Sequence, residues 1–350
     1  MSIREVTVAG VRIADDTDCF VIAEIGHNHQ GSVEKCKELF KAAKEAGASA
    51  VKLQKRENKD LFTREMYNRE YNSENAFGAT YGEHREALEF GRPQYVELQA
   101  YAKELGIAFF STAFDHKSAD FLNDLGMPAF KMASGDLTNT PLLKHVAAMG
   151  KPMIISSGGG TMDDVRRAVD LILPINRQLV LLQCTAGYPP AWEELNLRVI
   201  ETFRAAFPGV VIGWSSHDSG IAMALVGYTL GARVIEKHFT LNRSMRGTDH
   251  AFSLEPTGMR KLCRDLQRAR IAMGDGVKRP YESEKAPLLK MGKKLVASRD
   301  LAAGTVLKES DITFKSPADG MPPHAIDQFI GRTLKRGLSA DAAFALADIG

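Results

Sequence analysis

The run R-V-I-E-K-H-F, at residues 233–239, begins as a hydrophobic strand and ends in three adjacent ionisable side chains. Burial of a charge without a partner is costly, so this cluster requires water, ion partners or a ligand. Successive side chains of a strand alternate between its two faces, which places Glu236 and His238 on the same face. The pattern therefore indicates a polar site at the end of a buried strand.

Two lysines and several hydroxyl residues end other hydrophobic runs of the chain. Lys52 lies in AVKLQ and Lys131 in PAFKMAS, and the hydroxyls at comparable places are Thr112, Ser134, Ser156 and Ser215. Ammonium and hydroxyl donors that converge on one surface suit a small phosphorylated or carboxylated ligand. The SSGGGT segment at 156–161 precedes a helix with an acidic start and adds backbone N–H groups for an anion. The alternative is that Lys52 forms a Schiff base.

Two histidines, His217 and His238, end neighbouring hydrophobic runs. Two imidazoles on one surface can bind a divalent metal, with water or substrate completing the coordination. Their spacing is equally compatible with structural or acid–base histidines. His27, His29 and His84 are further candidates, although a single histidine in a loop is usually solvated.

A carboxylate, Glu24, ends the first hydrophobic run, within AEIGHNHQG. At the bottom of a cationic pocket it can act as a general acid or base. An ion pair with Lys52 or Lys131 is the alternative, and the two roles are compatible. Residues 55–92 form a long insertion, containing TYGEHREALEF, of the kind that covers a substrate site.

Eight hydrophobic runs must position these side chains, and they alternate with amphipathic helical segments. The runs cover residues 19–26, 50–54, 107–114, 128–134, 152–158, 179–185, 210–217 and 233–239. Eight consecutive βα units predict an α/β protein with a (β/α)8 barrel, whose active site lies at the C-terminal ends of the strands. A doubly wound sheet is the second choice, but no G-x-G-x-x-G follows the first run.

The chain is expected to divide into a barrel domain at 1–275, a linker at 276–292 and a small C-terminal domain at 293–350. Residues 257–273 are predicted to form the last helix of the barrel. The linker is rich in Pro, Gly and charge. The small domain has few helix signals and a thin core, so it is expected to pack on something larger.

Composition restricts the partners and the compartment. Lys and Arg number 45 against 43 Asp and Glu, which gives no reason to expect nucleic acid or an anionic membrane. No apolar run reaches the roughly 20 residues of a membrane span, and MSIREVTVAG lacks the hydrophobic segment of a secretory signal. The scattered cysteines contain no C-x-x-C pair. We expect a cytoplasmic protein.

Nine motifs at the strand ends resemble, in order, those of the sialic acid synthases. They are AEIGHNHQG, AVKLQK, FFSTAFD, FKMASGDL, MIISSGG, LQCTAGYP, SSHDSG, EKHFTL and GTDHAFSLEP. The C-terminal part resembles the antifreeze-like (SAF) domain of that family, a mainly β domain, and the resemblance covers essentially the whole chain. It implies a transferase that condenses phosphoenolpyruvate with N-acetylmannosamine, or its 6-phosphate, to N-acetylneuraminate, or its 9-phosphate, and phosphate.

The resemblance also implies roles for individual residues. Phosphoenolpyruvate would be bound by Lys52, Thr112, Lys131, Ser134, Ser156 and Ser215. Mn²⁺ or Mg²⁺ would be held by His217 and His238, and the sugar would contact Gln54, Tyr188 and Asp249. Glu24 would handle the proton of the attacking water, and Glu236 would support the site or pair with Lys237 or a neighbour. A domain-swapped homodimer is expected, because the small domain needs a surface to cover.

Two positions depart from many bacterial members. Ala186 replaces an Asn two residues before the Tyr of the strand-six motif, and Ser316 replaces an Arg of the SAF domain that reaches the partner's sugar. The TYGEH and SLEP stretches resemble the animal-type enzymes, which use the phosphorylated sugar and also lack that Arg. Lys315, Arg85 or Arg246 could supply the missing positive charge.

Two other functions are compatible with parts of the sequence. A synthase of a related nonulosonic acid, or another phosphoenolpyruvate-condensing synthase, shares the chemistry, although the SAF-like tail disfavours the latter. A non-catalytic sugar-binding or ice-binding protein would show a degraded set of polar strand ends, whereas Glu24, both lysines and both histidines are present. Phosphate release from phosphoenolpyruvate distinguishes the enzymes from the binding protein.

Overall fold

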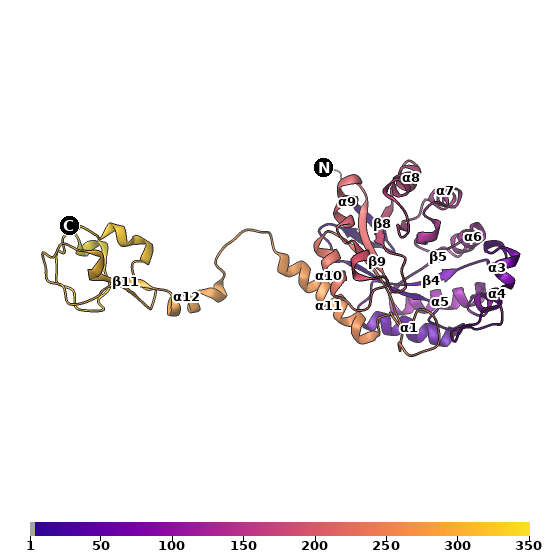
Figure 1. Cartoon of the computed structure of the whole chain (residues 1–350), viewed down its shortest axis with the longest axis horizontal. Helices are drawn as coiled ribbons and strands as arrows, with labels where there is room; N and C mark the ends of the chain where they lie inside the picture. Colours follow the sequence, from indigo (N-terminus) through magenta and orange to yellow (C-terminus); the bar gives the residue numbers. More distant parts are fainter. Residues whose placement is uncertain (1–3) are drawn as a thin grey trace. The chain divides into compact units, whose positions relative to one another are not determined.

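The computed structural model describes residues 4–350, which form two compact units (Figure 1). The first unit extends to Met273, and the second is Gly274–Gly350. In the part of the chain from residue 4 onward, no helix combines the length and the apolar character that a bilayer crossing requires.

Eight parallel strands close into a barrel in sequence order, and the last pairs with the first. The predicted (β/α)8 barrel and all eight strands are therefore confirmed. The strands are β3 (Phe20–Gly26), β4 (Ala50–Lys55), β5 (Ala108–Ala113), β6 (Phe130–Met132), β7 (Met153–Ser156), β8 (Leu179–Cys184), β9 (Val211–Ser216) and β10 (Val234–His238).

A helix follows each strand and packs on the outside of the barrel, as Figure 1 shows. Apolar side chains recur on one side of these helices because the helical repeat of 3.6 residues brings them to one face. The helices are α1 (Val33–Glu45), α5 (Arg92–Leu105), α6 (His116–Asp124), α7 (Thr140–Ala148), α8 (Met162–Ile172), α9 (Val199–Ala206), α10 (Ala222–Thr229) and α11 (Pro256–Met273). The last of these agrees with the helix predicted at 257–273.

Strand alternation separates the inside of the barrel from the layer under the helices. Phe20 and Ile22 belong to the inner apolar cluster, whereas Val21 and Ala23 belong to the outer one. The inner cluster continues into a hairpin that the sequence did not indicate, made of β1 (Glu5–Val8) and β2 (Val11–Ala14). The hairpin closes the N-terminal end of the barrel, so the interior is accessible from the opposite end.

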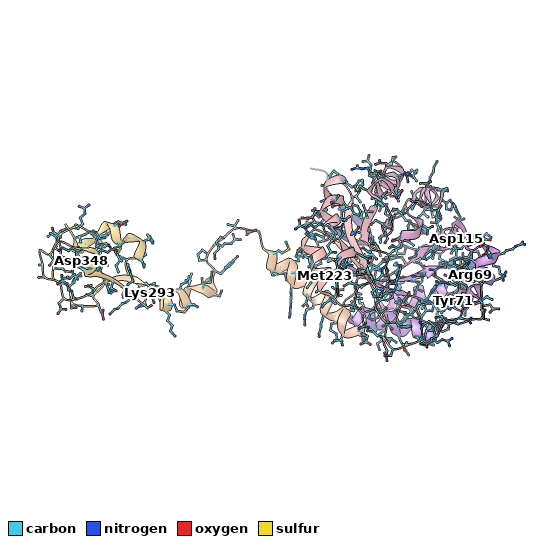
Figure 2. All side chains as sticks on the ribbon, viewed as in Figure 1. Arg69, Tyr71, Asp115, Met223, Lys293 and Asp348 are labelled. Carbon is cyan, nitrogen blue, oxygen red and sulfur yellow. The ribbon has the colours of Figure 1, made fainter. Side chains whose placement is uncertain are left out.

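The insertion predicted at 55–92 is present between β4 and α5. It contains three short helices, α2 (Asn58–Leu61), α3 (Arg64–Asn68) and α4 (Tyr81–Glu86). Backbone bonds from Tyr81 to Arg69 and from Tyr71 to Ala79 join its two halves, and Figure 2 labels Arg69 and Tyr71. The capping box of Thr80 and Glu83 fixes the start of α4.

The second unit has its own apolar core, which includes Leu295, Phe329 and Phe344. Its antiparallel pair is β11 (Lys294–Ala297) and β12 (Ile312–Lys315), and the regular structure that follows β11 otherwise consists of isolated bridges and short 3₁₀ turns. The segment expected to be a linker contains a short helix, α12 (Lys285–Met291).

Candidate active site

A cavity of about 660 Å³ opens at the C-terminal ends of the barrel strands. All twelve residues to which binding, catalytic or metal roles were assigned from the sequence line this cavity. The structure thus brings the expected residues together, while their individual roles stay predictions.

Strand register explains why these residues meet. Gln54, Thr112 and Lys131 lie side by side on β4, β5 and β6, and Glu24 lies beside Lys52 and His238. Residues in register on parallel strands point to the same face of the sheet, which here is the barrel interior. Polar residues at the last interior positions therefore form a single ring around the cavity.

At the bottom of the cavity two lysines and two glutamates are almost completely buried. Lys52 Nζ lies 2.6 Å from Glu24 Oε2 and donates to Thr112 Oγ1 at 2.8 Å. Glu236 accepts a hydrogen bond from Ser215 at 3.0 Å and lies 3.8 Å from Lys52. This cluster balances two positive charges with two negative ones in a region of low dielectric, where charges must be paired.

Lys131 is the lysine without a carboxylate at hydrogen-bonding distance. Its Nζ donates to Ser156 Oγ at 2.6 Å and to the carbonyl of Met132 at 3.0 Å, and Glu236 lies 3.9 Å away. Burial lowers the pKa of Lys131 from its ordinary value. Burial opposes ionisation of Glu236 as well, but the ammonium groups of Lys131 and Lys52 lower its pKa. The ammonium group of Lys131 is therefore available to pair with a bound anion.

Backbone and hydroxyl donors extend the cationic side of the cavity. The N–H of Gly158 donates to Ser134 Oγ at 3.0 Å, which holds that hydroxyl at the cavity wall. A side chain at 158 would collide with Ser134, since an added Cβ would lie 2.7 Å from its Oγ. The segment 156–161 thus presents small groups next to Lys131, as an anion site requires.

The two histidines at the cavity face each other with ring centroids 5.2 Å apart. Nδ1 of His217 donates to the carbonyl of Thr185 at 3.2 Å, which leaves its Nε2 with a lone pair. Burial, followed by the neighbouring His238, lowers the pKa of His217 to about 3. His238 Nδ1 is buried without a hydrogen bond and lies 3.6 Å from Asp249 Oδ2.

A neutral imidazole with a free lone pair, as at His217, fits a ligand of a divalent metal, and the unbonded ring nitrogen of His238 faces the same space. Within residues 4–350 no three His, Cys, Asp or Glu side chains form a complete ligand set, so a metal held here would take its other ligands from water or substrate. The histidines of the loops are not solvated, contrary to expectation. His29 stacks on Phe90 with centroids 4.2 Å apart, and His84 accepts the N–H of Phe77 at 3.1 Å.

The residues expected to contact the sugar lie nearer the mouth. Gln54 donates to Glu24 Oε1 at 2.7 Å and accepts from Arg56 at 2.6 Å. Tyr188 is 60% exposed, and its ring lies 4.0 Å from that of His217. An exposed aromatic face beside polar groups can stack on a sugar.

Strand alternation determines which way the charged side chains of β10 point. Lys237 points away from the cavity and pairs with Asp218 at 2.7 Å, so the alternative pairing of Glu236 with Lys237 is wrong. Glu236 instead faces Lys52 and Lys131. It shares a strand face with His238, and this was the sequence signal for its place in the site.

Other polar groups of the cavity wall were not assigned from the strand pattern. Arg56, Arg85, Asn75 and Thr248 line it; Arg56 directly follows β4, Arg85 lies on α4, and Asn75 and Thr248 lie on loops. The sequence indicated Arg85 only as a replacement for the missing positive charge of the SAF arginine. Of the other substitutes, Arg246 lies over the ring of Phe77 at 4.9 Å.

At the departures from the bacterial pattern the structure shows small groups. Ala186 lines the cavity with a methyl group where an amide is common. In the second unit, Ser316 accepts from Lys293 at 2.6 Å, and Lys315 is paired with Asp341.

Two family models match the chain in separate segments. The model of the NeuB family matches residues 39–278, and the SAF domain model matches residues 294–350. N-acetylneuraminate-9-phosphate synthase of Homo sapiens is 41% identical over 315 residues, covering 90% of this chain and 88% of that protein. N,N'-diacetyllegionaminic acid synthase of Legionella pneumophila is 37% identical over 328 residues, covering 92% of each chain.

A solved structure agrees with these matches. The N-acetylneuraminic acid synthetase of Leptospira borgpetersenii, crystallised with citrate, superposes with a TM-score of 0.71 at 29% identity. The match covers 81% of this chain and 95% of that one. On the match of its barrel and on the identity to these relatives, the chain belongs to the NeuB family.

Proposed function

We propose that this protein condenses phosphoenolpyruvate with an amino-sugar aldehyde of the N-acetylmannosamine type to give a sialic acid or a related nonulosonic acid and phosphate. The observation that carries the proposal is the convergence of two buried lysines, two buried glutamates and two facing histidines at the open end of the barrel. The relatives that are synthases of such acids, and that match 90% and 92% of this chain, support it.

Phosphoenolpyruvate would occupy the bottom of the cavity. Its anionic groups would meet Lys131 and Lys52, with hydroxyl donors from Thr112, Ser134, Ser156 and Ser215. The available ammonium group of Lys131 and the small backbone segment at 156–161 support this placement. Charge-assisted hydrogen bonds in a dry pocket are strong enough to fix the orientation of the enol.

His217 and His238 would hold the divalent metal, Mn²⁺ or Mg²⁺. When bound, the metal supplies a Lewis acid for the aldehyde of the sugar. The carbonyl of Thr185 fixes the tautomer of His217 and directs its Nε2 lone pair away from the backbone.

Gln54, Tyr188 and Asp249 would orient the open-chain sugar. C3 of phosphoenolpyruvate forms the new bond to the aldehyde carbon, water adds at C2, and the C–O bond to phosphate breaks. Glu24 would accept the proton of that water. Its Oε1 bond from Gln54 and its 2.6 Å contact with Lys52 hold the carboxylate in a fixed position beside both substrates.

The assembly is inferred to be a domain-swapped homodimer located in the cytoplasm. The second unit is small, with apolar residues such as Leu288, Leu289 and Met291 exposed, which supports association. Four free cysteines support a reducing compartment. A monomer in sedimentation at micromolar concentration would contradict the dimer.

Phosphate release tests the function. The purified protein with Mn²⁺ and phosphoenolpyruvate is supplied with N-acetylmannosamine or its 6-phosphate, and the keto-acid product is identified by mass. Acceptor-dependent phosphate release together with that product is expected. Absence of release with any amino-sugar acceptor, in a folded and metal-supplied protein, would refute the proposal.

A further inference from the structure

A buried ion pair lies directly behind the two histidines of the cavity, on the outer face of the barrel wall. Lys237 precedes His238 on β10, and Asp218 follows His217 beyond the end of β9. Lys237 and Asp218 are only 1% and 2% exposed, and neither lines the cavity. Nζ of Lys237 donates to Oδ1 of Asp218 at 2.7 Å and to its backbone carbonyl at 2.6 Å. The ammonium group therefore joins the chain neighbours of the two histidines to each other.

The backbone at His217 is no longer fixed by the hydrogen bonds of the barrel strands. β9 pairs with β8 and β10 no further than Ser216, and residues 217–221 belong to no helix or strand. His238, in contrast, is still in register with Glu24 on β3. The position of one imidazole relative to the other therefore depends on the contacts of the segment that follows β9.

The segment after β9 is held from three places. Ser216 Oγ donates to Asp218 Oδ1 at 2.5 Å and accepts the N–H of Asp218 at 3.2 Å, which closes a turn around His217. The carbonyl of Thr185 on the other side accepts from the ring of His217. Lys237 is the one of these three partners that belongs to β10, the strand of His238. It is therefore the direct connection between the supports of the two rings.

Stability alone does not account for this ion pair. Both charges lose their hydration on burial, so replacement of such a pair by apolar side chains of similar volume is often neutral or stabilising. The surrounding layer is part of the outer apolar cluster, and the ring of Trp214 lies 5.6 Å from Lys237 Nζ. Charge-assisted hydrogen bonds, unlike apolar contacts, have a defined length and direction. The pair is therefore suited to fixing geometry.

Two imidazoles bind one ion only within a narrow range of separations and orientations, and groups behind the ligands commonly set both. The ring centroids of His217 and His238 are 5.2 Å apart. We propose that Lys237, acting through Asp218, is a positioning residue for the histidine pair. It holds the segment of His217 against the strand of His238, and so sets the spacing at which both rings bind one divalent cation. This inference rests on the proposed function for the metal role of the histidines.

Binding of Mn²⁺ measured without turnover tests the inference. Free Mn²⁺ is quantified from its paramagnetic resonance signal as the protein is titrated, and calorimetry gives the affinity for phosphoenolpyruvate in the absence of metal. Lys237→Met should weaken Mn²⁺ binding by about 10- to 100-fold, the usual effect of removing a group that orients a metal ligand. The affinity for phosphoenolpyruvate should change by less than about threefold, because its expected partners are Lys52 and Lys131.

Further variants separate positioning from stability. Lys237→Met leaves Asp218 buried without its cation, which costs stability. The double variant Lys237→Met with Asp218→Asn removes both charges together, so it should stay folded and weaken Mn²⁺ binding by the same factor. His238→Ala gives the loss expected when a ligand itself is removed. Lys151→Met is the matched control, because Lys151 contacts the carbonyl of Asn123 at 3.5 Å and lies before the start of β7, away from the histidines.

Mn²⁺ binding by the double variant within about threefold of the unaltered protein would overturn the inference. A double variant that fails to fold, or that loses affinity for Mn²⁺ and phosphoenolpyruvate in parallel, would also overturn it, because the pair would then serve stability in general. The same holds if the unaltered protein binds no Mn²⁺, or if His238→Ala leaves that binding unchanged. If the variants behave as expected while no amino sugar supports phosphate release, the positioning role stands and the proposed reaction fails.

Discussion

Replacement of Lys131 by methionine tests the assignment of the deep anion site. Lys131 is nearly isosteric with methionine in its apolar part, and its ammonium group is the cationic partner of Ser156 Oγ at 2.6 Å. A desolvated charge pair between this ammonium and an anionic substrate is worth about 2–5 kcal/mol when one partner is removed. Lys131→Met should therefore lower kcat/KM for phosphoenolpyruvate by about 30-fold to several thousand-fold.

The same variant changes stability in two opposing ways. Because burial lowers the pKa of Lys131, the folded state holds this proton less tightly than the unfolded state at neutral pH, and the charge opposes folding. The cost is present at pH values below the lowered pKa and disappears as the pH rises toward the ordinary one. Removal of Lys131 also takes away the ammonium group that lowers the pKa of Glu236 most, and it leaves two buried carboxylates with one ammonium, so Tm should fall.

Two measurements decide the outcome, namely phosphate release at varied phosphoenolpyruvate concentration and calorimetric unfolding. Lys151→Met is the matched control, because Lys151 is also a lysine with a pKa lowered by burial but contacts the carbonyl of Asn123 outside the cavity. A kcat/KM within about threefold of the unaltered protein would refute the assignment of Lys131 to the anion. An unchanged Tm would refute the argument that Lys131 balances the buried carboxylates.

Further predictions concern the metal and the barrel. His238→Ala should abolish metal-stimulated turnover and leave the far-ultraviolet circular dichroism spectrum unchanged; turnover that persists in this variant with a chelator present would contradict the metal role. Gly213→Ala should lower Tm, because the added Cβ would lie 2.5 Å from the carbonyl oxygen of Val234 and against Leu182 inside the barrel. An overpacking cost of about 1–3 kcal/mol corresponds to a fall in Tm of about 2–12 °C for a unit of this size. An unchanged Tm would contradict this prediction, because it would mean that the strands shift to accommodate the added methyl group.

The sequence was sufficient for the barrel and for most of the ring of polar side chains. Repetition of short apolar runs and amphipathic segments reflects a local periodicity, which depends on backbone geometry and is visible in one chain. Once eight parallel strands are inferred, their C-terminal ends must lie on one face. Glu24, Lys52, Lys131, His217 and His238 could therefore be grouped without coordinates.

The sequence periodicity does not predict which charged side chains pair with each other across the cavity. Whether Glu236 faces Lys237 or the two interior lysines depends on which face of β10 is inside, and on the side chains that neighbouring strands bring to the same level. The role of β1 and β2 as a cover was also missed, because a short hairpin carries few apolar residues and gains its stability from the barrel interior.

The difference between what the sequence predicts and what the tertiary structure shows is clearest for the cluster of His27, Arg56 and Arg85. Each residue by itself has an ordinary sequence environment, and three segments of the chain contribute one side chain each. Local propensity determines that each segment forms a loop or a short helix, but not which side chains meet across them. The sequence alone determined the barrel and the end at which chemistry occurs. Only the tertiary structure decided which charges there are paired and which are left free, because closure of the barrel and docking of the insertion set those distances.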